Sequence, residues 1–202
     1  RDSIRTYEEC LGLEKFIGSR LLGSIYSNFG AVLYESGDLL RGEQFVHQSI
    51  SVFELGGTAL NFSIAHCHLS LVALLQDRPE KAWKEILISK QYAEQMDFKR
   101  GLAAAALIQG QIKAQQNEVA KAQSLMQKGL AQFASLQIEE GLNYEIAGRT
   151  CRYLKDFSQA EQFLEKGLQI SEAFPMYHAA LYVEQAKLFQ IQNRNEWKES
   201  YH

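Results

Sequence analysis

The chain has 202 residues, of which 46% are hydrophobic, so it can bury a sizeable core within one domain or one stretch of a longer array. Its net charge of −3, from 21 basic and 24 acidic residues, gives no general reason to expect nucleic acid or an anionic membrane as a partner. No run of about 18 apolar residues occurs, so no segment is expected to span a bilayer.

Helical patterns follow one another from the start of the chain. Residues 3–11 carry Ser3, Tyr7 and Cys10 on one stripe, which is typical of the second helix of a hairpin. Further along, four segments share a small residue, an apolar residue four positions later and a small residue seven positions after the first. These segments are residues 42–50, 82–90, 122–130 and 160–168, at spacings of 40, 40 and 38. Positions i, i+4 and i+7 lie on one helix face, so each segment predicts a helix.

A second small residue stands 12 positions before the first small residue of each segment. The resulting pairs are Gly30/Gly42, Ser70/Ala82, Gly110/Ala122 and Gly148/Ala160. Each unit is therefore predicted to be two helices that approach closely at these residues. Turn-forming and capping residues fall between the two helices, at Gly37-Asp38, Asp77-Arg78-Pro79, Asn117 and Asp156. At the end of the chain, Tyr182 and Ala186 fit a further first helix, whose partner would begin at Asn195.

This signature resembles the tetratricopeptide repeat, although the usual unit is about 34 residues long. The longer spacing is similar to that of the extended repeats in bacterial regulators and scaffold proteins. The resemblance implies an all-α fold, a right-handed solenoid of stacked antiparallel hairpins with about ten helices. The expected parts are a partial unit 1–18, repeats 19–58, 59–98, 99–137 and 138–175, and a partial unit 176–202. Neither end carries a polar cap, so we expect a single solenoid segment that belongs to a longer protein.

The residue patterns that usually mark catalysis, cofactors or metals are not matched. His66, Cys67 and His68 form the most metal-like cluster, but helical histidine ligands need i, i+4 spacing. Glycines occur singly or in turns and never as a phosphate-binding loop. Cys10 and Cys151 are far from Cys67 and from each other, which favours reduced thiols in a cytoplasmic protein. We expect no enzymatic activity, no cofactor and no metal.

The resemblance implies that the first helix of each hairpin lines a concave binding face. The candidate groove residues carried over from it are Tyr34, Leu71, Leu74, Leu75, Leu107, Gln111, Arg149, Arg152, Tyr153 and Lys187. The middle of this set is apolar and its C-terminal part is basic. Arginine can bind carboxylate or phosphate in a bidentate fork, which favours a partner with an acidic segment. The alternative is that the leucines pack against neighbouring repeats and the arginines are solvated.

Two classes of function remain open. One is a protein–protein interaction module that binds a peptide or helix of a partner protein, without contact to nucleic acid or membrane. The other is an effector-sensing domain of a bacterial signalling protein or transcriptional regulator. Self-association through uncapped ends is a further alternative. A DNA-binding or nucleotide-binding domain on the same polypeptide would favour the sensor, since fold alone does not define function.

Overall fold

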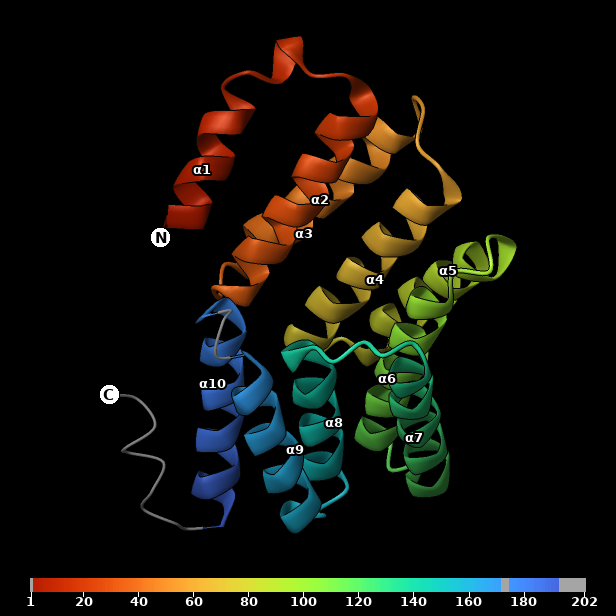
Figure 1. Ribbon diagram of the computed structural model, residues 1–202, viewed down its shortest axis with the longest axis vertical. Helices are drawn as coiled ribbons and strands as arrows, with labels where there is room; N and C mark the ends of the chain where they lie inside the picture. The colour runs from red at the N-terminus through yellow and green to blue at the C-terminus, as the bar shows by residue number, and fades with distance from the viewer. Residues whose placement is uncertain (1, 172–174, 193–202) are drawn as a thin grey trace. The chain divides into compact units, whose positions relative to one another are not determined.

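The structure is a computed structural model that describes residues 2–171 and 175–192. Within them lie ten α-helices, a 3-10 helix η1 (Glu14–Phe16) and no strand, so the all-α prediction is confirmed. The α-helices are α1 (Asp2–Leu11), α2 (Ser19–Glu35), α3 (Leu39–Phe53), α4 (Ala59–Leu75), α5 (Pro79–Gln95), α6 (Lys99–Gln115), α7 (Val119–Ser135), α8 (Gly141–Tyr153), α9 (Phe157–Ile170) and α10 (Pro175–Ile191) (Figure 1). The helix expected from Asn195 falls outside the described residues.

Each expected repeat holds two consecutive helices: α2 and α3, α4 and α5, α6 and α7, and α8 and α9. The predicted turns between them are confirmed. Asp38 and Asp156 cap α3 and α9, because their side chains accept hydrogen bonds from backbone N–H groups three residues later, at 3.3 Å and 3.1 Å. Pro79 is the first residue of α5, where its missing N–H costs nothing. Each of the four turns inside these hairpins contains a residue with positive φ: Gly37, Asp77, Asn117 and Lys155.

The predicted small-residue pairs lie where the two helices of a hairpin touch. A Cβ atom placed on Gly30 would lie 2.9 Å from the carbonyl oxygen of Gly42, and one on Gly42 would lie 2.9 Å from that of Gly30. A Cβ on Gly110 would lie 3.1 Å from the carbonyl oxygen of Ala122. These distances leave almost no room for a side chain, so the close approach predicted from the repeat pattern is confirmed.

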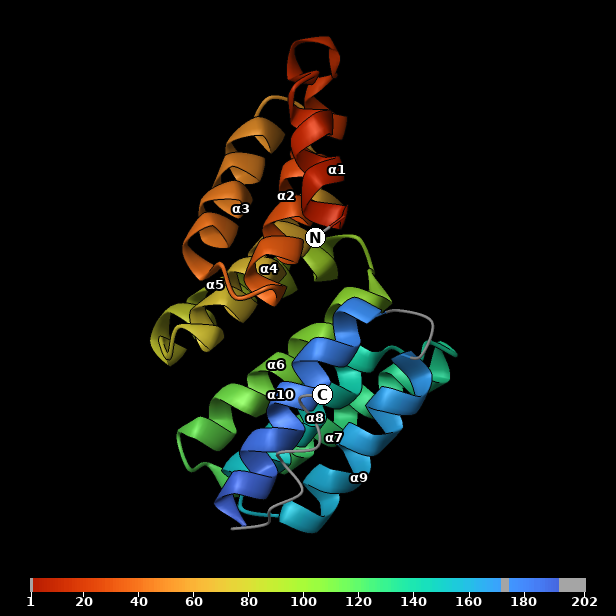
Figure 2. The same cartoon turned by 90° about the vertical axis from the view of Figure 1, so that its left-hand side faces the viewer.

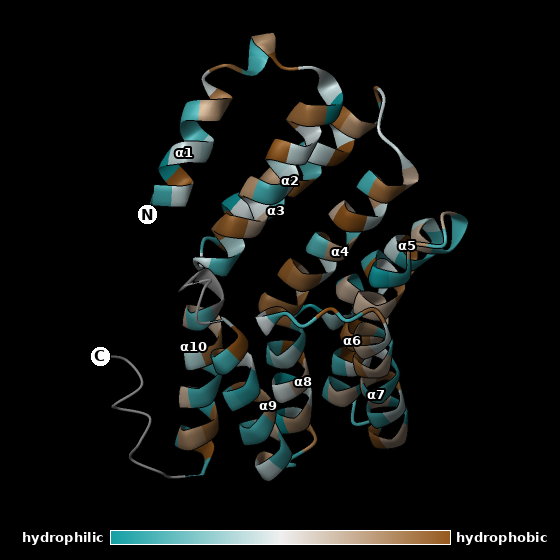
Figure 3. Ribbon diagram, viewed as in Figure 1, coloured by the Kyte–Doolittle hydropathy of each residue, from teal (hydrophilic) through white to brown (hydrophobic). Residues whose placement is uncertain are grey.

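The chain divides into two compact units, unit 1 (Arg1–Ala105) and unit 2 (Ala106–His202), with the boundary inside α6. In unit 1 the core is formed by Val46 and Phe53 of α3 with Ala65 and Leu69 of α4. Hydrophobic residues occur along most of α4 (Figure 3), which agrees with its burial on more than one side. This helix is therefore the centre of the packing in unit 1.

In unit 2, α8 packs against α9, and both contact α10 (Figure 2). The largest apolar side chains of this unit that are less than 2% exposed are Leu107, Ile108, Ile112, Leu164, Leu181 and Leu188. They come from α6, α9 and α10, so the core of unit 2 depends on residues far apart in the sequence. None of the described helices is both long enough and apolar enough to cross a bilayer.

Candidate binding surface

The candidate groove residues of unit 1 are mostly buried. Tyr34, Leu71 and Leu74 are 4%, 6% and 5% exposed, whereas Leu75 is 37% exposed. Burial of Leu71 and Leu74 agrees with the alternative in which these leucines pack within the fold. Leu75 is the candidate leucine of unit 1 that offers its side chain to solvent.

Tyr34 is held by a polar contact between α2 and α4. Its hydroxyl lies 2.8 Å from Nδ1 of His68. Burial lowers the pKa of His68 to about 4. The imidazole is therefore neutral near pH 7, and Nδ1 can accept a hydrogen bond from the Tyr34 hydroxyl.

The low pKa of His68 predicts an acid-sensitive stability. Below about pH 6.5 the unfolded chain binds a proton at this residue, whereas the folded chain binds it only near pH 4, so stability falls as the pH drops through this window. The expected loss is on the order of 2 kcal/mol, and His68→Gln, which keeps an acceptor but does not titrate, should abolish it. Urea unfolding at several pH values between 7.5 and 4 measures the free energy of unfolding. The same dependence on pH in the unchanged protein and in His68→Gln would contradict the prediction.

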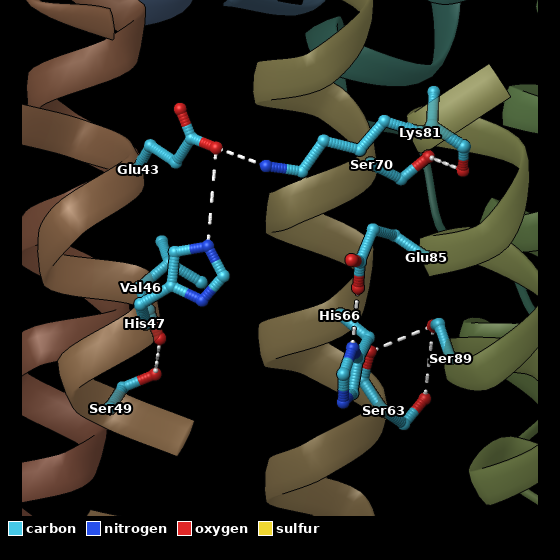
Figure 4. A network of polar contacts seen from close by, with 11 residues as sticks. Glu43, Val46, His47, Ser49, Ser63, His66, Ser70, Lys81, Glu85 and Ser89 are labelled. Carbon is cyan, nitrogen blue, oxygen red and sulfur yellow. Dashed lines mark hydrogen bonds and ion pairs between the residues drawn. The ribbon is translucent and has the colours of Figure 1, made fainter. Parts of the chain in front are cut away.

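Polar side chains connect the helices of unit 1 (Figure 4). Ser70 Oγ donates to the carbonyl oxygen of Ala82 at 2.8 Å, and Ser89 Oγ donates to that of Ser63 at 2.7 Å, so α4 and α5 are joined twice. Glu43 of α3 forms an ion pair with Lys81 of α5. These contacts fix neighbouring helices against one another within the unit.

The histidines of the metal-like cluster take part in different contacts. Nδ1 of His66 lies 2.7 Å from a carboxylate oxygen of Glu85 (Figure 4), whereas His68 contacts Tyr34. Among the described residues, no group of three or more His, Cys, Asp or Glu side chains is placed to hold a metal ion. Burial raises the pKa of the Cys67 and Cys151 thiols to about 12, so neither is a thiolate near neutral pH.

In unit 2 the groove residues of α6 are enclosed. Leu107 and Gln111 are both 0% exposed. Neither amide atom of the Gln111 side chain has a hydrogen-bond partner. A buried, unpaired amide is costly, by about 1–3 kcal/mol, so Gln111 is not explained by packing alone.

The basic residues predicted for the groove belong to a charged network on α8 and α10. Arg149 forms ion pairs with Glu145 and with Glu184, the latter at 3.4 Å from Nε to Oε1. Arg152 lies 2.9 Å and Lys187 lies 2.7 Å from the same Glu184 carboxylate. The side chains of Glu184, Arg149 and Arg152 are 2%, 9% and 13% exposed, whereas that of Lys187 is 49% exposed. The structure thus brings the three predicted cations together. They form ion pairs with two carboxylates of the same chain, Glu145 and Glu184.

Burial acts differently on the two carboxylates of the charged network. It raises the pKa of Glu145, and the nearby Arg149 only partly opposes this. Burial also works against ionisation of Glu184, but Arg149, Arg152 and Lys187 bring the pKa of that carboxyl down to about 2. Three cations therefore face at most two negative charges, and the network stays net positive at neutral pH.

Tyr153, the remaining candidate, flanks this network. The guanidinium carbon of Arg152 lies 4.7 Å from the centre of the Tyr153 ring, which is a cation–π distance.

The sequence analysis did not assign a role to Glu184. Its position three residues before Lys187 is the signal that could have identified it as a helical ion-pair partner.

No protein-family model matches this chain, and the comparison with curated proteins found no significant similarity. The likeness to tetratricopeptide repeats therefore rests on the repeat pattern of the sequence.

Proposed function

We propose that this protein is a non-enzymatic interaction module of the cytoplasm that binds a peptide or helix of a partner protein along the first helices of its hairpins. The observation that supports this proposal is the net positive network of α8 and α10 at positions expected to line the groove. Arg149 and Arg152 are largely buried in this network, whereas Lys187 is 49% exposed at its edge. An accessible cation on a net positive network favours a partner that carries an acidic residue.

The exposed face of α10 gives the proposal a defined contact surface. Val183, Lys187 and Ile191 follow one another at intervals of four residues and share one face of this helix. Val183 and Ile191 are 36% and 50% exposed. We call these three residues the α10 stripe. An amphipathic partner helix would place apolar side chains on Val183 and Ile191 and an acidic side chain on Lys187.

Lys187→Glu tests this surface. We expect it to weaken binding by about 1 kcal/mol and to slow association, since an exposed charge acts mainly on encounter. Lys187 carries the test because it is half exposed, whereas Arg149 and Arg152 hold the fold together. The measurement is affinity capture of a partner, followed by titration of the identified protein at low and high salt.

Lys90→Glu is the matched control, because Lys90 of α5 has a similar exposure of 40% and pairs with Glu94. Capture that is reduced in Lys187→Glu and retained in Lys90→Glu supports the α10 stripe. Equal binding by both variants and by the unchanged protein, at any salt concentration, would show that the partner binds elsewhere.

The alternative function is an effector-sensing domain of a bacterial signalling protein or transcriptional regulator. The observation that favours it is a cleft between α7, α8 and α9. A cleft of that kind takes a small molecule, and its occupancy could be read by a neighbouring domain.

A further inference from the structure

A cleft of about 340 Å³ opens on unit 2. It is formed by α7, by the connection 136–140, and by the facing sides of α8 and α9. Its lining residues are Leu130, Ala131, Phe133, Ala134, Ile138, Glu139, Asn143, Tyr144, Phe163 and Lys166. The volume falls at the lower end of small-molecule sites, which span about 300–1,000 Å³.

Asn143 is the unusual residue of this cleft. It is 4% exposed, and its Nδ2 donor has no hydrogen-bond partner. The same position of the other repeats, five residues before the small residue of the first helix, holds Ile25, Ala65 and Ala105. An apolar residue therefore suffices for packing at this place. A buried donor left without an acceptor destabilises the fold, so packing alone does not account for an amide at this position.

The rim of the cleft carries a balanced ion pair. Lys166 Nζ lies 3.1 Å from Glu139 Oε1, and the hydroxyl of Tyr144 donates to the same oxygen at 3.2 Å. Lys166 also lies 4.7 Å from the centre of the Tyr144 ring. Because the two charges compensate each other, a charged ligand would be attracted by one of these side chains and repelled by the other.

We propose that this cleft binds a small molecule without net charge that has an apolar ring or branched body and one hydrogen-bond acceptor. The apolar body of the ligand would lie against Phe133, Ile138 and Phe163. The Nδ2 group of Asn143 would donate a hydrogen bond to the acceptor of the ligand. The ion pair between Glu139 and Lys166 at the rim would stay intact when the ligand binds. This site is separate from the proposed partner surface on α10 and does not depend on it.

Three molecules of similar size test the class of ligand: benzamide, benzoate and benzylamine, which are neutral, anionic and cationic at pH 7. Each is titrated into the full chain labelled with ¹⁵N, and the shifts of Ile138, Glu139 and the Asn143 side-chain amide are followed by NMR. We expect saturable shifts, with benzamide bound about threefold or more tightly than the two ions. Absence of saturable shifts at these residues, or equal affinity for all three probes, overturns the proposal.

Asn143→Ala separates a ligand role from a structural one. It should weaken benzamide binding about three- to tenfold and, because it removes an unpaired buried donor, raise the unfolding temperature by about 2–4 °C. An unchanged affinity, or a lower unfolding temperature, would show that Asn143 serves the fold and would overturn its assignment.

Ala134→Leu fills the cleft from an exposed position of α7 and should abolish the shifts. Ala120→Leu, at an exposed position of the same helix outside the cleft, is its control and should bind benzamide as the unchanged protein does. Binding that survives Ala134→Leu would place the probe elsewhere and sink the proposal.

Discussion

Replacing Glu184 by glutamine should destabilise the protein by about 3–5 kcal/mol, the usual effect of removing one partner of a buried ion pair. The substitution keeps the size of the side chain and removes only its charge. Arg149 and Arg152 would then be left largely buried with Glu145 as the remaining carboxylate, and burial raises the pKa of Glu145. Urea unfolding at pH 7 measures the change in free energy. Glu9→Gln is the control, because its pair with Arg5 is exposed and should be worth less than about 1 kcal/mol.

The same residue gives a pH signature in the unchanged protein. Its folded pKa of about 2 lies below the ordinary value of 4.5, so its contribution is complete above pH 4.5 and is lost as the pH falls towards 2. Glu184→Gln should lack this loss. If both proteins are equally stable at pH 7 and lose stability alike in acid, the network does not hold α8 and α10 together.

The charged network also shows how far the candidate site could be predicted. The repeat register predicted that Arg149, Arg152 and Lys187 are neighbours, and in the structure all three contact Glu184. The register could not pair Arg152 with Glu184, because these two residues are 32 positions apart in the sequence. Such a contact depends on the rotation of α10 against α8, which packing decides and no local spacing encodes.

Gly110→Leu should destabilise the protein by about 1–3 kcal/mol or more through overpacking. A Cβ at this position would lie 3.0 Å from the backbone nitrogen of Met126 and 3.1 Å from the carbonyl oxygen of Ala122. Backbone atoms cannot rotate away, so α6 and α7 would have to separate. Thermal unfolding followed by circular dichroism measures the effect.

Gly18→Leu is the control for the added side chain. Nothing lies within 4 Å of a Cβ placed on Gly18, which is exposed before α2. A comparable loss of stability in both variants would show that the effect comes from removing a glycine and not from the close contact between helices.

The fold was more predictable than the site because its signals are local and repeated. Small residues spaced 12 apart mark every hairpin crossing, and Asp38 and Asp156 mark helix starts. The boundary inside α6 carries no such signal, since Ala105 and Ala106 stand within one continuous apolar stretch. Asn143 was visible as a polar residue at a position that is apolar in the other three repeats, but its role depends on a cleft that only the packed helices form.

The two serine contacts between α4 and α5 have a mechanical consequence. Ser70 and Ser89 each donate to a carbonyl oxygen of the opposite helix, at points 7 residues apart along both α4 and α5. One such contact would act as a pivot, whereas two prevent both sliding and rotation of the helix pair. Under a pulling force, the hairpin of α4 and α5 would therefore yield by shearing two hydrogen bonds at once. Helices α2 and α3 cross at Gly30 and Gly42, which have no side chain that could form such a hydrogen bond.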